Sequence, residues 1–133
     1  MLQVTRHLSI ALLFSLLAAC TLQANNAEKV TQQQLLERIA AQEDMLILDV
    51  RTPGEYSEGY IANAINIDHR EVESRLNEII PFKDKAVVVY CYSGMRAGRV
   101  ESMLAEKGFS KIQHLEGDWS AWQSSGLAVT LPK

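Results

Sequence analysis

Short apolar runs that lack in-and-out alternation constrain the fold of this chain most. They lie at residues 45–50, 64–67, 86–90 and 111–115, and the third, AVVVY, is the most strongly apolar. Strands that are apolar on both sides are typical of a parallel sheet whose two faces are covered by helices. Because stretches with helical spacing separate the runs, we predict one α/β domain with a central parallel sheet and helices on both faces.

Helices are predicted in the intervening stretches, at residues 31–40, 55–56, 68–80, 95–107 and from residue 118 onward. Asp68 is expected to cap the third of these helices and Pro81 to end it. Asp118 is expected to be the N-cap of the last, which carries Trp119 and Trp122 on one side.

Composition excludes several classes of protein. A chain of 133 residues argues for one domain, and a formal net charge of −3 gives no sign of the basic patch of a nucleic-acid-binding protein. Two cysteines exclude a disulfide framework, and no Cys and His cluster has metal-ligand spacing, so we predict neither metal nor cofactor. His7, His69 and His114 are scattered, and a surface or capping role is expected for each. A domain of this size can fold alone, and we expect a monomer.

Residues 1–20 are predicted to direct export. Arg6 and His7 precede an apolar run at residues 8–19, which is shorter than the roughly 20 residues that cross a membrane. A basic start, a short apolar core and small residues after it are typical of a secretory signal. An uncleaved anchor and a buried helix are the alternatives.

The signal ends in LAAC at residues 17–20, which resembles a bacterial lipobox. Cys20 would then carry a lipid, and Thr21 after it would favour the outer over the inner membrane. Cleavage nearby, for example after Ala24, is the alternative and would release a periplasmic protein. Residues 21–30 are polar and are predicted to form a flexible tether, which leaves residues 31–133 as the folded domain. A membrane is expected as a partner only through the lipid on Cys20.

The segment YCYSGMR at residues 90–96 follows the valine-rich strand, where open parallel sheets place their ligand sites. A lone cysteine in such a place is often core packing. Three features favour a reactive thiolate at Cys91: Gly94 permits a tight turn, amides at a helix start converge on an anion, and Arg96 adds positive charge. A solvated arginine in the first turn is the alternative for Arg96.

Three segments together resemble the rhodanese-like family. CYSGMRAG at residues 91–98 resembles its active-site loop, and residues 48–67 resemble its upstream signature of D-x-R, E-[FY] and G-H-I-x-G-A. LEGDWSAW at residues 115–122 resembles its closing L-E-G-G-x-x-A-W. The segments follow the family's order. The chain departs from the pattern at Tyr60, Asn63 and Asp118, where His, Gly and Gly are usual.

The resemblance implies a rhodanese-like fold and a thiosulfate sulfurtransferase. Cys91 would take the outer sulfur of a small anionic donor, release sulfite and hold the sulfur as a persulfide until a thiophilic acceptor removes it. The substrate-binding group implied by the family loop is Tyr92, Ser93, Gly94, Met95 and Arg96. Arg96 would bind the anionic donor. Asp49 and Arg51 are carried over as supporting positions, chiefly as an ion pair that braces the sheet end, and Arg51 could also add positive field.

Two other functions fit parts of the pattern. Cysteine phosphatases need a larger loop, C-x-x-x-x-x-R, but the sixth residue after Cys91 is Ala97, and Arg96 and Arg99 lie on either side of that position. A non-catalytic persulfide carrier or binding module is the other alternative. Turnover of Cys91 with a small donor would indicate an enzyme and not a carrier or a binding module.

Overall fold

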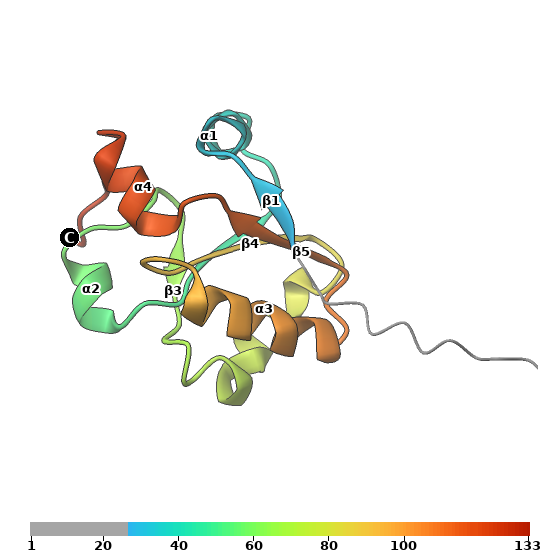
Figure 1. The fold of residues 1–133 in the computed structure, drawn as a ribbon. Helices are drawn as coiled ribbons and strands as arrows, with labels where there is room; N and C mark the ends of the chain where they lie inside the picture. The colour runs from blue at the N-terminus through green and yellow to red at the C-terminus, as the bar shows by residue number, and fades with distance from the viewer. Residues whose placement is uncertain (1–26) are drawn as a thin grey trace, which may run out of the picture.

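The computed structural model describes residues 27–133, which form a five-stranded, all-parallel sheet in the order β1-β5-β4-β2-β3 (Figure 1). The elements are β1 Glu28–Val30, α1 Gln32–Ala40, β2 Leu46–Asp49, α2 Pro53–Ser57, β3 Ile65–Asn66, the 3₁₀ turns η1 Glu73–Glu78 and η2 Ile80–Phe82, β4 Ala86–Tyr90, α3 Met95–Glu106, β5 Lys111–Leu115 and α4 Asp118–Ser124. Among these, no helix is both long and apolar enough to cross a bilayer. The predicted signal, Cys20 and tether residues 21–26 lie outside the described residues, so export and lipidation stay predictions.

Helical segments cover both faces of the sheet, as predicted. Figure 1 shows α1 and α4 on one side and α3 with the 3₁₀ turns on the other. Successive residues of a strand point to opposite faces, so Val87 and Val89 pack in the cluster that contains α3, whereas Val88 and Tyr90 pack in the cluster that contains α1 and α4. This double burial explains why β2 and β4 are continuous apolar runs.

Two predictions for the chain were wrong in their details. Residues 28–30, assigned to the tether, form the edge strand β1, which pairs with β5 through Val30 and Leu115 at one end. The predicted helix at residues 68–80 is instead two 3₁₀ turns, with a break in helical geometry at Arg75. Both oxygens of Asp68 are bound to Arg70, two residues away, so the carboxylate closes a local turn and caps no α-helix.

The carboxyl ends of β2, β4 and β5 meet at one edge of the sheet, because all strands run in the same direction. Strand β4 leads directly into the Cys91 loop and α3, and β5 leads through Gly117 into α4. The backbone amides of Trp119 and Ser120, in the first turn of α4, donate to the carbonyls of Cys91 and Tyr92, both at 3.0 Å. The start of α4 therefore holds the loop after β4, since first-turn amides lack partners within their own helix.

Candidate active site

The thiol of Cys91 lies inside the loop that joins β4 to α3. Cys91 is 1% exposed, and its Sγ accepts a hydrogen bond from the backbone amide of Gly94 at 3.0 Å. Gly94 has a φ of +109°, a conformation that a residue with a Cβ adopts only with strain, and it is the residue that precedes α3. The loop thus aims an amide and the start of a helix at the sulfur, an arrangement that can stabilise negative charge placed there.

The predicted binding residues of the loop fall into two groups. Gly94 contributes its amide, and Arg96 is half-buried beside the loop. The side chains of Tyr92, Ser93 and Met95 are exposed, and Met95 is 72% exposed. These three residues can therefore stabilise a buried sulfur through their backbone amides, while their side chains line the approach from solvent.

Arg96 is paired with a carboxylate. Its Nη1 and Nη2 donate to the two carboxylate oxygens of Glu55 at 2.8 and 2.9 Å. Glu55 is fixed in turn by Thr52, whose backbone amide and Oγ1 donate to Oε2 at 2.9 and 3.0 Å. The hydrogen bonds from Arg96 are the largest cause that lowers the pKa of Glu55 to about 2, so the pair is ionised at neutral pH.

Asp49 and Arg51 form a buried ion pair at the end of β2, in the bracing arrangement that we expected from the sequence. Arg51 Nη2 donates to Asp49 Oδ2 at 2.6 Å and to the carbonyl oxygen of Gly59 at 2.8 Å. The guanidinium also lies 4.3 Å from the ring centroid of Trp119. This pair joins β2, the loop before β3 and α4. The positive field of Arg51 at the pocket stays a prediction.

Asp118 was predicted to be the N-cap of α4, but it is not. Gly117 is the N-cap of α4, and Asp118 is its first helical residue, 3% exposed, with a φ of +54°. Its Oδ1 accepts a hydrogen bond from the backbone amide of Cys91 at 3.0 Å, and its Oδ2 contacts His114 Nε2 at 2.9 Å. A positive φ is costly for a residue with a Cβ, and here it accompanies a carboxylate that holds the backbone amide of Cys91.

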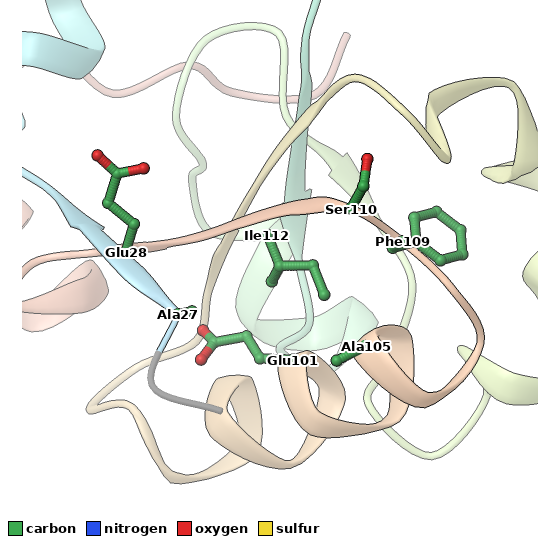
Figure 2. A pocket seen from close by; sticks show the side chains of 7 residues that line it. All are labelled: Ala27, Glu28, Glu101, Ala105, Phe109, Ser110 and Ile112. Carbon is green, nitrogen blue, oxygen red and sulfur yellow. The ribbon is translucent and has the colours of Figure 1, made fainter. Parts of the chain in front are cut away.

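His114 connects Asp118 to a second carboxylate, which corrects the expected surface or capping role. Its Nδ1 pairs with Oε1 of Glu101 in α3, and its side chain is 17% exposed. The hydrogen bonds to Asp118 and then to Glu101 raise the pKa of His114 to about 10, so the imidazole is charged at neutral pH. Glu101 also lines a hollow of about 220 Å³ between α3, β1 and β5 (Figure 2). No residue of the Cys91 loop is part of its lining.

His114 is expected to make folding stability fall as pH rises. Its pKa is raised from an unfolded value near 6.5 to about 10, so the native state binds the extra proton between these values. The stabilisation is complete below pH ~6.5 and is lost through pH ~10, by on the order of 3 kcal/mol. Urea unfolding at a series of pH values should show a steeper decline for the wild type than for His114→Gln.

Gln123→Ala, which removes an exposed and uncharged side chain of α4, is the control and should keep the wild-type slope. Parallel pH dependence of the wild type and His114→Gln would contradict the charged state of His114.

The site is a buried cysteine in a loop that turns at a glycine, at the carboxyl edge of a parallel α/β sheet. This arrangement defines a class of domain that presents a candidate nucleophilic thiol. The family model for the rhodanese-like domain matches residues 31–125, so this chain belongs to the rhodanese-like family.

Relatives and solved structures agree with this assignment. The chain is 33% identical over 105 residues to a sulfurtransferase of Allochromatium vinosum, covering 79% of this chain and 96% of that protein. It is 34% identical over 70 residues to the thiosulfate sulfurtransferase PspE of Escherichia coli, covering 53% and 67%. A rhodanese-related protein of Thermoplasma volcanium superimposes with a TM-score of 0.69 at 31% identity, over 79% of this chain and 99% of that one. Family and relatives together support sulfurtransferase activity in general.

Proposed function

We propose that the protein moves a sulfane sulfur from thiosulfate or a similar donor to a thiophilic acceptor through a persulfide on Cys91. The observation that carries the proposal is the hydrogen bond from the Gly94 amide to Cys91 Sγ inside a closely wrapped loop. Because Cys91 is 1% exposed, a donor must present one slender terminal atom to reach it. A sulfane sulfur meets that requirement better than a phosphoryl group with its three oxygens.

The transfer proceeds in two steps. The Cys91 thiolate attacks the outer sulfur of thiosulfate, the S–S bond of the donor breaks, and its electron pair leaves with sulfite. Cys91 then carries a terminal persulfide anion, which the Gly94 amide and the start of α3 stabilise. An acceptor nucleophile such as cyanide attacks this outer sulfur and regenerates the thiolate. The enzyme alternates between two forms, which is ping-pong catalysis.

The experiment that tests this function follows sulfur on the protein itself. Protein purified from cells that express the full chain is reduced, mixed with thiosulfate or with an organic persulfide, and analysed by intact mass. We expect the mass to increase by one sulfur atom, located on the peptide that contains Cys91. Cyanide should then release thiocyanate and restore the original mass over repeated cycles.

A folded protein whose Cys91 thiol titrates but which gains no sulfur from either donor would overturn the proposal. A single loading without repeated turnover would favour a persulfide carrier instead. We propose the envelope as the site of the reaction, on the basis of the signal predicted at residues 1–20.

A further inference from the structure

Two carboxylates and the imidazole between them form a triad behind the Cys91 loop. Glu101 of α3 pairs with Nδ1 of His114, and Oδ2 of Asp118 lies 2.9 Å from Nε2 of the same ring. The other carboxylate oxygen of Asp118 accepts a hydrogen bond from the backbone amide of Cys91 at 3.0 Å. The side chains of Glu101, His114 and Asp118 are 7%, 17% and 4% exposed, so solvent screens their charges weakly.

The triad also lies against Gly94, the residue whose amide donates to Cys91 Sγ. A Cβ on Gly94 would lie 3.1 Å from Asp118 Oδ2 and 3.7 Å from His114 Nε2. Asp118 and the Nε2 side of His114 are therefore packed directly against the loop that surrounds the sulfur, whereas Glu101 is bound at the other ring nitrogen.

The carboxylate of Asp118 places a negative charge beside a loop that has to hold another one. The Cys91 thiolate carries negative charge, and so does the persulfide that replaces it in the proposed reaction. Like charges that lie close together and are shielded from water oppose each other strongly. A positive charge on His114 offsets that of Asp118 and leaves its oxygen free to accept the Cys91 amide.

We propose that His114 is a positioning residue whose positive charge neutralises Asp118, so that Asp118 holds the Cys91 amide without opposing the anion on sulfur. The inference rests on the proposed function and adds a residue to its machinery. Glu101 assists because it pairs with the second ring nitrogen, and an imidazole that donates from both nitrogens is charged. The hydrogen bonds to Asp118 and then to Glu101, which raise the pKa of His114 to about 10, agree with this charge state.

The neighbouring strands add one further charged side chain on this face of the sheet. His114 is in register with Val89 of β4, which is uncharged, and with Lys29 of β1. Residues in register point to the same face, but Lys29 is exposed, so solvent screens its charge. The charges that act on the imidazole are those of Glu101 from α3 and Asp118 from α4.

The test compares His114→Gln with the double variant His114→Gln/Asp118→Asn. Sulfur loading of Cys91 from thiosulfate is followed at neutral pH by rapid quench and intact mass, on protein purified from cells that express the full chain. His114→Gln should load roughly tenfold more slowly, because the charge of Asp118 is no longer offset. The double variant should regain most of the wild-type rate, since asparagine keeps an oxygen for the Cys91 amide and carries no charge.

Two measurements report the charge of the imidazole directly. The NMR chemical shifts of the His114 ring at neutral pH should be those of the doubly protonated form. Above a pH of about 10 the ring becomes neutral, so loading by the wild type should fall relative to loading by the double variant, which has neither charge. Circular dichroism at each pH verifies that both proteins remain folded.

Lys29→Gln is the matched control. It removes a positive charge on the same face of the sheet, but among the described residues Lys29 forms no ion pair with either carboxylate of the triad. Loading should therefore stay within about twofold of the wild type.

A neutral His114 ring at neutral pH would overturn the inference, and so would a folded double variant that loads as slowly as His114→Gln. In both cases loading by the wild type would still support the proposed function. Alkylation of Cys91 by iodoacetamide needs no sulfur donor, and its rates in the three proteins should follow the same order. Absence of loading in the wild type would overturn the proposed function, while the alkylation rates would still support or overturn the role of His114.

Discussion

Replacing Cys91 with alanine is expected to abolish sulfur transfer, with a loss of more than about 10³-fold in thiocyanate formation. The reason is chemical, because the thiolate is the atom that carries the sulfur between the two half-reactions. The variant should release no thiocyanate, and its mass should not increase by one sulfur atom when a donor is added. Cys91→Ser is the closer structural match, since its hydroxyl can accept the Gly94 amide hydrogen bond that Sγ now accepts.

Folding of both Cys91 variants can be checked by thermal unfolding. The serine variant should remain folded and equally inactive, which separates loss of the nucleophile from loss of the loop. Substantial transfer by a folded Cys91→Ala protein would show that another group carries the sulfur.

Replacing Asp118 with alanine is expected to destabilise the fold by about 3 kcal/mol or more and to slow sulfur loading by roughly 10²-fold. The substitution removes the acceptor of the buried Cys91 amide and leaves the charged His114 with one carboxylate. Alanine also adopts the positive φ of this position only with strain, and it makes no hydrogen bond that would compensate for it. Urea unfolding gives the stability, and rapid-quench mass analysis gives the loading rate.

Two further substitutions separate the roles of Asp118. Asn keeps an oxygen for the Cys91 amide and tolerates a positive φ, so it should restore most of the loading rate while weakening the pair with His114. Gly relieves the backbone but supplies no acceptor, so it should remain slow. A glycine variant as fast and as stable as the wild type would show that the carboxylate has no positioning role.

Most of the strands, and the place of Cys91 in the loop after β4, could be predicted from the sequence because their signals are local. A strand buried on both faces is mostly apolar, which makes β4 and the first three residues of β2 recognisable without any knowledge of their partners. Strand β1 has the sequence EKV, which is not an apolar run. This segment is a strand because it pairs with β5, a contact that its own sequence does not indicate. The turns at residues 73–82 were missed as well, because local carboxylate–arginine contacts took the place of a helix cap.

The side chains that reach the Cys91 loop from elsewhere in the fold could not be predicted, because they depend on contacts between distant segments. Glu55 and Arg96 are separated by 41 residues, and Asp118 reaches the Cys91 amide across 27. The one available signal was the aspartate at position 118, where the family pattern has glycine. The carboxylate that replaces the usual glycine contacts the backbone amide of Cys91 and the side chain of His114.

The parallel direction of β1 sets how the domain is oriented with respect to its point of attachment. Since β1 runs in the same direction as β4, the chain enters the sheet at the edge opposite the Cys91 loop. If Cys20 carries a lipid, the anchor is joined to the domain at the edge of the sheet opposite the Cys91 loop. Sulfur compounds and proteins that approach the carboxyl edge of the sheet would then reach the Cys91 loop without passing the point of attachment.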